Sequence, residues 1–356
     1  MNKFVICKFE NKYSKVLKDF NSRIASTNNH FPDPSNWQFY ENKSPITQEF
    51  YILLEDDTYI RAISAIKNQN YQLNDTLINF QDIQLPVSES LIDVRFISQT
   101  IYFLKYISNL GSNMHALGMG GISTPLPKIL IKNKFSSHLI PFFIFPISLT
   151  SFFELALFNK FKIKLNRLFF SPLIVIDFVR IFFLKKMYEM KNVNIEPFFD
   201  FDSSFSTLWE KLKSNFQLIA VKDAINLNRL YQNSPHDLIK YKIFIKNQYL
   251  GYIILKITKH QNNKYFQNFK TITIVDLLCE NAYYSRFIKI IKNIALKNNC
   301  DLILVNSSFD KFNISLSKAM FLNLPSNFGF VYKTESNFNI LNSWITRADG
   351  DGPINV

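Results

Sequence analysis

Carboxylates occupy matching places in two apolar segments of the sequence, and such groups can act as general bases. Asp82 and Glu89 lie on or just after one of these segments, and Asp276 and Glu280 lie at the end of the other. A carboxylate within hydrogen-bond reach of an amine can accept its proton and turn it into a nucleophile. Side chains alternate between the two faces of a strand, so we do not expect all of them to point into one cleft. We take Glu280, Glu89 and Asp276 as the candidate catalytic residues.

The stretch HALGMGGISTPLPKIL (115–130) is rich in glycine in a glycine-poor chain. Three of the chain's eight glycines fall there: Gly118, Gly120 and Gly121. Glycine tolerates a positive φ and permits close approach of a ligand, so the cluster predicts either a tight turn or a binding loop. Its spacing fits neither the dinucleotide fingerprint nor the P-loop. If it is a binding loop, the glycines should line a substrate cavity that also receives Ser88 and Glu89, with His115 beside it.

Metal-binding and disulfide patterns are missing from the sequence. The three cysteines are odd in number and far apart, and the five histidines are scattered without ligand spacing. We therefore predict no metal site and a reduced, cytoplasmic protein. Near the C-terminus, Asp349 and Asp351 alternate with glycines. Such a run can bind a substrate amine or hydroxyl, and it is also typical of a solvated turn.

The elements that must position these residues occur twice in the same order. Alternating apolar residues predict a hairpin in each half, at 49–67 and 241–259. A strand and an amphipathic helix follow each hairpin, at 77–85 and 88–110 in the first half and at 271–280 and 282–299 in the second. A short strand, a second helix and aromatic strands come next in both halves, and helical regions at 13–26 and 205–230 precede the hairpins. An internal duplication explains this repetition most simply.

A basic, aromatic-rich segment joins the two halves. The chain has a formal net charge of +13, which favours anionic partners. Much of this charge lies between 160 and 191, in Lys160, Lys162, Lys164, Arg167, Arg180, Lys185, Lys186 and Lys191.

Within that segment, the apolar run 168–184 contains Asp177 and Arg180. It is too short and too charged for a membrane span, which needs about 20 apolar residues. Ser171 followed by Pro172 predicts a helix from about 172 to 188. We expect this helix to pack against both domains as a connector. The alternative is a helix that rests on an acidic bilayer.

The repeated order of hairpin, strand, helix, strand, helix and strand resembles the GNAT acyltransferase fold in tandem. The runs LPVSES, HALGMGG, PLPKIL and IPFFIF, followed by KDAINLNRLY, TIVDLL and SWITRADGDG, resemble bacterial two-domain GNAT-like proteins associated with surface-polysaccharide gene sets. The resemblance implies a mixed α/β (α+β) fold of two tandem GNAT-like domains, each a mixed, splayed sheet flanked by helices. It places the domains at 1–155 and 201–356, with a helical connector at 156–200.

The resemblance also implies a cofactor, acetyl-CoA or another acyl-CoA. In GNAT domains this molecule lies between two splayed strands, with its pyrophosphate on the amides that begin the next helix. The matching positions of the second half are Leu278, Cys279, Tyr284, Ser285, Arg286 and Asn313. The usual glycine-rich phosphate loop has no equivalent, because 86–90 and 280–286 contain no glycine. The run SWITRADGDG adds Trp344 to the substrate-binding candidates Ser88, His115, Asp349 and Asp351 and the three glycines.

The leading hypothesis is a cytoplasmic, N-acetyltransferase-like acyltransferase. It moves an acyl group from a thioester donor to an amine or hydroxyl on a small molecule or a sugar-linked acceptor, in surface-polysaccharide biosynthesis. Contact of 160–191 with an acidic membrane surface would make it peripheral to the inner membrane. Two alternatives stay open: a FemAB-like aminoacyl-tRNA-dependent transferase, whose positive charge follows the RNA backbone, and a non-catalytic GNAT-like scaffold or membrane-surface partner. Outside the tRNA alternative, we expect no nucleic-acid partner.

Overall fold

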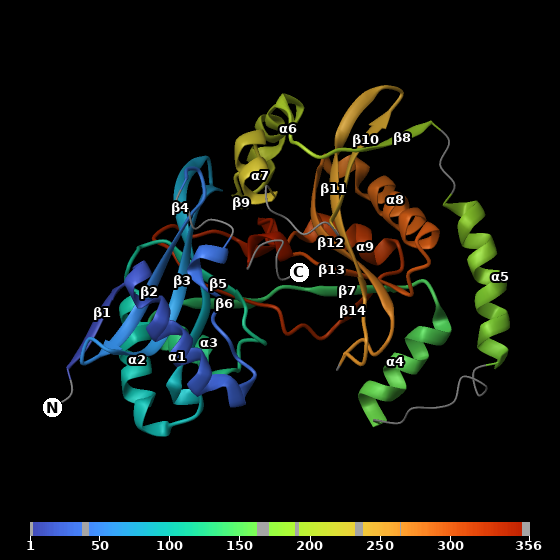
Figure 1. Cartoon of the computed structure of the whole chain (residues 1–356). Helices are drawn as coiled ribbons and strands as arrows, with labels where there is room; N and C mark the ends of the chain where they lie inside the picture. The colour runs from blue at the N-terminus through green and yellow to red at the C-terminus, as the bar shows by residue number, and fades with distance from the viewer. Residues whose placement is uncertain are drawn as a thin grey trace.

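Two mixed β-sheets stand side by side in a computed structural model of the chain, and helices pack on each of them (Figure 1). The structure describes residues 3–37, 43–161, 171–188, 192–231, 238–263 and 265–350. One apolar cluster of the first sheet joins three of its strands to the C-terminal segment, through Tyr71, Phe80, Leu218 and Ile345. The largest cluster of buried apolar residues belongs to the second sheet and its helices.

The first sheet has the strand order β1-β2-β3-β4-β5-β15-β6, and β9 also pairs with β3. Its strands are β1 (Phe4–Lys8), β2 (Thr47–Glu55), β3 (Tyr59–Leu73), β4 (Thr76–Ser88), β5 (Met114–Gly118), β6 (Ser136–Leu139), β9 (Leu218–Ala220) and β15 (Gly329–Lys333). The helices α1 (Ser14–Ile24), α2 (Ile97–Ile107) and α3 (Pro125–Lys132) pack on it. The turn between β3 and β4 consists of Asn74 and Asp75, both with positive φ, which suits a tight hairpin.

The second sheet has the strand order β14-β7-β13-β12-β11-β10-β8. Its strands are β7 (Phe142–Pro146), β8 (Val193–Pro197), β10 (Leu238–Ile245), β11 (Gln248–Lys259), β12 (Lys270–Cys279), β13 (Leu302–Asn306) and β14 (Leu322–Leu324). Its helices include α6 (Ser203–Leu212), α7 (Ala224–Tyr231), α8 (Tyr284–Lys297) and α9 (Asp310–Lys318). Read strand by strand, the two sheets repeat one order of elements, so the predicted mixed α/β fold of two repeated units is confirmed.

One strand of each half lies in the sheet of the other half. The β7 strand comes from the first half but pairs with β13 and β14, and β15 comes from the second half but pairs with β5 and β6. The predicted boundaries 1–155 and 201–356 therefore do not separate the two sheets. Each sheet needs a strand from the other half to complete its backbone hydrogen bonds.

The central parallel strands of each sheet separate after a short stretch of pairing. In the first sheet, β4 and β5 pair only at Gln81 with Met114 and at Asp82 with His115. In the second sheet, β12 and β13 pair from Thr271 to Thr273. Beyond these points the carboxyl ends of the strands diverge, and the predicted splay is present in both sheets.

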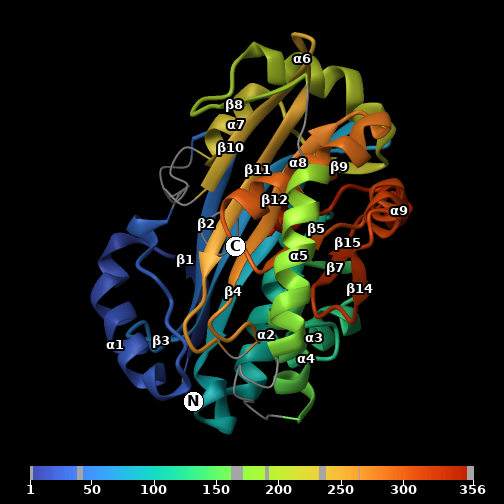
Figure 2. The ribbon, with the colours of Figure 1, turned by 90° about the vertical axis from the view of Figure 1, so that its right-hand side faces the viewer.

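The described part of the joining segment packs on the second sheet. It contains α4 (Leu149–Phe161) and α5 (Ser171–Met187), and β8 is an edge strand of the second sheet. Helix α5 contacts α4 and α8 and lies on the side of the second sheet away from the first sheet (Figures 1 and 2). The prediction of a helix near 172–188 is confirmed, but the expectation that it packs against both domains is wrong. Residues 162–170 and 189–191, with four of the predicted basic residues, lie outside the described residues.

A search of the described residues finds no helix with both the length and the apolar character to span a membrane.

Candidate functional site

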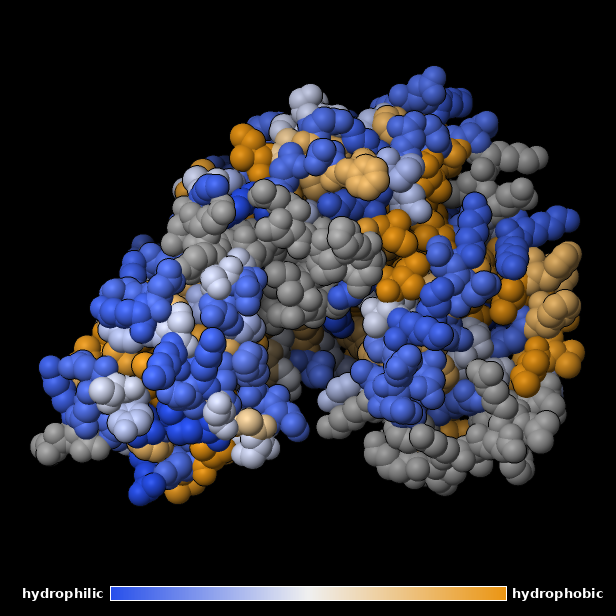
Figure 3. Space-filling view, in the orientation of Figure 1, coloured by the Kyte–Doolittle hydropathy of each residue, from blue (hydrophilic) through white to orange (hydrophobic). Residues whose placement is uncertain are grey.

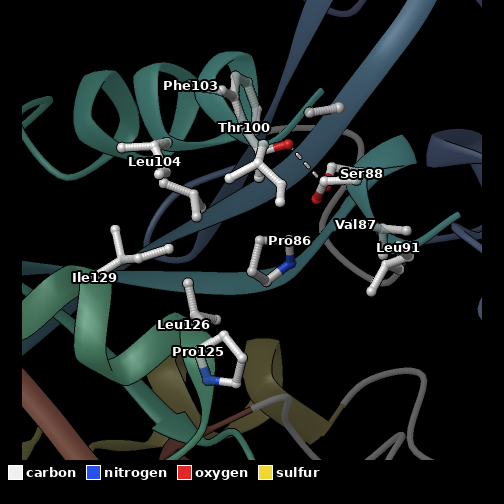
Figure 4. Close-up of a pocket in the computed structure, with 14 residues that line it drawn as sticks. Pro86, Val87, Ser88, Leu91, Thr100, Phe103, Leu104, Pro125, Leu126 and Ile129 are labelled. Carbon is white, nitrogen blue, oxygen red and sulfur yellow. Dashed lines mark hydrogen bonds between the residues drawn. The ribbon is translucent and has the colours of Figure 1, made fainter. Parts of the chain in front are cut away.

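An apolar pocket opens where β4 leaves β5 in the first half. We call it the α2–α3 pocket, because these two helices form its walls over the end of β4 (Figure 4). Its volume is about 370 Å³, within the range of small-molecule sites. The lining side chains are almost all apolar, and they include Pro86, Val87, Leu91, Phe103, Leu104, Leu126 and Ile129. Such a pocket favours the apolar part of a ligand.

A bulge in β4 directs residues into this pocket. Ala65 pairs with Gln84 and Ile63 pairs with Val87, so two residues of β4 face one of β3, and Leu85 has a φ of +42°. A one-residue bulge reverses which side chains point to each face. Before the bulge, Ile83 faces α2, and Asp82 and Gln84 face the other side of the sheet. After the bulge, the even-numbered residues Pro86 and Ser88 line the pocket beside α2.

Three hydroxyl groups provide the pocket's polar side. Ser88 Oγ lies 2.6 Å from Ser90 Oγ, and Thr100 Oγ1 donates to Ser88 Oγ at 3.0 Å (Figure 4). Thr100 also lies 2.9 Å from the carbonyl oxygen of Phe96. Ser88 is the predicted substrate-binding residue that the structure places in this pocket.

Glu89, predicted as a base, anchors the loop after β4 instead of facing the pocket. Its carboxylate is buried and pairs with Arg23 of α1 and Arg61 of β3, and Arg61 also pairs with Glu55. Each of its two carboxylate oxygens is engaged by one guanidinium group, so Glu89 is used in these ion pairs. The same pairs neutralise the negative charge that the sequence places near this helix start.

The three clustered glycines form a turn. All three have positive φ, of +90° at Gly118, +71° at Gly120 and +104° at Gly121, and the N–H of Gly121 donates to the carbonyl of Gly118. Thr124 Oγ1 lies within hydrogen-bond distance of the carbonyls of Met119 and Gly121, and Pro125 opens α3. Neither the glycines nor Glu89 line the pocket that receives Ser88. The predicted cavity shared by these residues is therefore wrong, and the geometry matches the tight turn.

A buried polar cluster lies on the opposite face of the first sheet, at the point where β4 and β5 separate. Lys67 Nζ and His115 Nδ1 each lie 3.5 Å from a carboxylate oxygen of Asp82, on different oxygens, and Gln84 donates to Asp82 at 3.0 Å. Lys67 also donates to the carbonyl of Gly350 at 2.6 Å. We call Lys67, Asp82, Gln84 and His115 the β4 polar cluster; the C-terminal segment covers it.

Burial sets the protonation of this cluster. It raises the pKa of Asp82 to about 6, against the opposing effects of Lys67 and Gln84. Burial and, second, the charge of Lys67 lower the pKa of His115 well below its usual value, so the imidazole is neutral. Within the described part of the chain, neither ring nitrogen of His115 has a hydrogen-bond partner, and the ring packs 4.7 Å from that of Phe80. At neutral pH, the arrangement therefore holds an ionised carboxylate beside a neutral imidazole.

Asp276, the third predicted base, lies in a corresponding cluster of the second half. Lys222 Nζ lies 2.8 Å from both of its carboxylate oxygens, and the hydroxyls of Tyr252 and Tyr231 lie at 3.1 and 3.5 Å from one of them. The backbone N–H of Leu277 also donates to it. Asp276 is completely buried and fully paired by these contacts.

The space between α8 and α9, which corresponds to the α2–α3 pocket, holds aromatic side chains. Trp344 is buried, and its ring stacks on that of Tyr284 at 6.1 Å and packs on Phe216, Phe309 and Phe312. Trp344 and Tyr284, predicted as substrate and cofactor contacts, thus lie together in an apolar core.

The other predicted site residues are distributed over the second half. Leu278 and Cys279 are buried in β12, and Asn313 Nδ2 donates to the carbonyl of Ser307. Ser285 and Arg286 are exposed at the start of α8, and the half-buried Glu280 pairs with Lys211 of α6 at 2.5 Å.

Asp349 is buried rather than in a solvated turn. Its carboxylate accepts from the backbone and hydroxyl of Thr346 in a capping box, and it lies 3.5 Å from the hydroxyl of Tyr71. Asp351 lies outside the described residues.

The sequence interpretation missed two groups of residues. One is the pair of buried lysines, Lys67 and Lys222, each next to a central carboxylate. Their signal is a lysine inside an otherwise apolar stretch. The other group is the apolar lining of the α2–α3 pocket, which gives no signal, because its residue types are those of an ordinary core.

Comparison with known proteins identifies the fold. No protein-family model and no curated protein matches the sequence. Solved structures do match: N-myristoyltransferase of Saccharomyces cerevisiae with bound myristoyl-CoA superposes with a TM-score of 0.55 at 13% identity, over 100% of this chain and 86% of the other. The chain has the fold of GNAT acyltransferases.

Two further GNAT-fold structures agree with this result. A GCN5-related N-acetyltransferase from Anabaena variabilis has a TM-score of 0.55 at 12% identity, over 92% of this chain and 72% of that one. A probable N-acyltransferase from Enterococcus faecalis, a conserved protein of unknown function, has a TM-score of 0.54 at 10% identity, over 93% and 72% of the two chains. At these identities the likeness concerns the fold alone. The splayed strand pairs of this chain are β4 with β5 in the first sheet and β12 with β13 in the second.

Proposed function

We propose that this protein transfers an acyl group from a thioester donor, an acyl-CoA, to an amine, and that the donor binds in the α2–α3 pocket. The observation that carries this proposal is the pocket's position at the splayed end of β4 and β5. Among the residues that the structure describes, the edge of β4 that faces β5 has no strand partner after Asp82. That edge can pair with the amides of a pantetheine arm.

The residues present fit the apolar part of such a donor. The α2–α3 pocket is large enough for an acyl chain or a pantetheine arm, and three hydroxyls stand at one side. The nucleotide end has weaker support, because Asp93 accepts the N–H of Arg95 in the turn before α2 and no glycine loop is present. The donor is therefore selected mainly by its acyl chain.

The β4 polar cluster supplies the base in this proposal. Asp82 lies four positions before Pro86 on the same strand and faces the opposite side of the sheet. A thioester in the gap between β4 and β5 would therefore lie between the α2–α3 pocket and the β4 polar cluster. The amine nitrogen of the acceptor attacks the thioester carbonyl, and the C–S bond breaks. Asp82 takes the proton of the amine, and the thiolate takes a proton from water.

Titration of the purified chain with acyl-CoAs of increasing chain length tests donor binding. Each buried methylene is worth about 0.8 kcal/mol, so the affinity should rise about fourfold per methylene until the pocket is full. Leu126→Trp should abolish binding, because Leu126 lines the pocket. Ile131→Trp, an exposed position on the same helix outside the lining, should bind as the wild type does. Equal affinity in both variants would contradict the proposed site.

The surface-polysaccharide role is the finer part of the proposal, and it depends on the resemblance of the sequence runs. A panel of acceptors tests it: amino sugars linked to a nucleotide or lipid should be acylated faster than free amino acids. Transfer from charged tRNA would indicate the aminoacyl-tRNA-dependent transferase instead. Lack of binding to every acyl thioester would indicate a non-catalytic scaffold.

A further inference from the structure

Helix α5 directs Asp177 and Arg180 toward the protein. Asp177 is buried and accepts hydrogen bonds from the backbone N–H groups of Leu149 and Thr150, at 2.7 and 2.8 Å, so it caps the start of α4. Arg180 donates to the carbonyls of Ile147 and Pro146 at 2.6 and 2.8 Å. The two charges that break the apolar run of the sequence are therefore used inside the molecule.

The outward face of the same helix is apolar. We call it the α5 outer face; its exposed residues are Ile174, Val175, Ile176, Phe178, Val179, Phe182, Phe183 and Met187. Phe178 is 78% exposed, and Phe182 and Phe183 are each 63% exposed. A surface helix normally presents polar residues to water, so this pattern is reversed. Figure 2 shows α5 as the outermost element on this side, and Figure 3 shows apolar side chains along the same edge of the molecule.

A cationic groove adjoins the α5 outer face at its C-terminal end. It lies between α5, β8 and α8, shares Phe182 with that face, and contains Lys185, Lys186 and Lys297. Among the residues that the structure describes, its lining contains no acidic side chain. The apolar surface thus has a positively charged border on one side.

We propose that the α5 outer face docks on an anionic lipid bilayer, with α5 in the interface plane and the lysine groove at the phosphate level. An interfacial helix combines these two features, apolar side chains that enter the acyl boundary and cations that attract anionic headgroups. A helix of 17 residues is about 26 Å long, enough to lie along the surface. A second copy of this chain suits the surface less, because the chain carries a net charge of +13 and an isologous contact would bring two such copies together.

Vesicle co-sedimentation of the full chain tests this proposal. The wild type should bind phosphatidylcholine vesicles that contain phosphatidylglycerol, and binding should weaken as salt is added. The double variant Phe178→Ser/Phe183→Ser should bind at least about tenfold more weakly, because the free energy of burying a phenylalanine is lost at two positions. Lys185→Gln/Lys186→Gln should lose roughly tenfold on anionic vesicles.

Matched variants distinguish docking through the α5 outer face from non-specific binding to vesicles. Phe199→Ser removes a phenylalanine that is 89% exposed on the link between β8 and α6, and Lys128→Gln/Lys132→Gln removes two exposed lysines of α3. Both should bind like the wild type. The proposal is overturned if the double phenylalanine variant binds equally well, or if the wild type binds equally well to vesicles without anionic lipid. A dimer in light scattering that this variant breaks would assign the face to a second copy.

Discussion

The two splayed strand pairs of this molecule have the same surroundings but different contents. In the first half, the space between α2 and α3 is an apolar pocket of about 370 Å³. In the second half, the space between α8 and α9 holds Trp344, which stacks on Tyr284. The bridge between Trp344 and Ile219 and its backbone bond to Leu218 fix the tryptophan in place. The same place in the repeated fold is thus an open pocket in one half and part of the core in the other.

The buried aspartates of the two halves also differ, since Asp276 is more closely paired than Asp82. Asp276 has two contacts of 2.8 Å to Lys222, besides contacts to two tyrosines and a backbone N–H. Asp82 lies at 3.5 Å from both Lys67 and His115. The first half therefore combines the open pocket with the carboxylate that has the longer contacts.

The largest expected effect comes from Asp82→Asn. If Asp82 is the base, this change should lower kcat about 10²- to 10⁴-fold, measured as thiol release from the donor. Asp276→Asn should reduce stability but leave the rate per folded molecule within about threefold, since its partners are structural in this view. A loss of rate per folded molecule in Asp276→Asn alone would move the catalytic centre to the second half.

Trp344→Ala should cost about 3–5 kcal/mol of unfolding free energy, because it empties a completely packed aromatic site. Urea denaturation measures this cost. The affinity for the donor should not change, because the pocket of the first half is intact. A gain of a second donor molecule per chain, measured by calorimetry, would show instead that the tryptophan closes a working site.

The pH dependence of stability and activity tests the role of Asp82. The pKa of Asp82 is about 6 in the folded protein, above its unfolded value near 3.9, so its contribution to stability is full below about pH 4 and is lost as pH rises through 6. The change is on the order of 2–3 kcal/mol, and the wild type minus Asp82→Asn difference in urea denaturation isolates it. Activity should run the other way and rise through pH 6, because the base must be ionised. A variant with an unchanged profile would exclude Asp82 from both effects.

Local signals predicted the elements, and long-range partners limited the rest. The predicted hairpin at 241–259 and the predicted helix at 282–299 match β10 with β11 and α8 within a few positions. The exchange of β7 and β15 has no local signal, since both are short aromatic strands that suit either sheet. The role of Glu89 depends on Arg23, which lies 66 positions away in the sequence. The face that α5 turns outward depends likewise on the start of α4, which Asp177 caps.

The smallest expected effect concerns the turn of three glycines before α3. An added Cβ at Gly120 would meet only Thr124 Cγ2, at 3.5 Å, which is ordinary contact, so the φ of +71° is the cost of Gly120→Ala. We expect a loss on the order of 1 kcal/mol in urea denaturation, with donor affinity unchanged once the folded fraction is corrected for. Gly120→Asn is the matched control, because asparagine tolerates the left-handed region; it should recover much of the loss although its side chain is larger. A different result would overturn this view: both variants weaken donor binding in proportion to side-chain size and keep wild-type stability. The turn would then contact a ligand, and it would belong to the binding region of the first half.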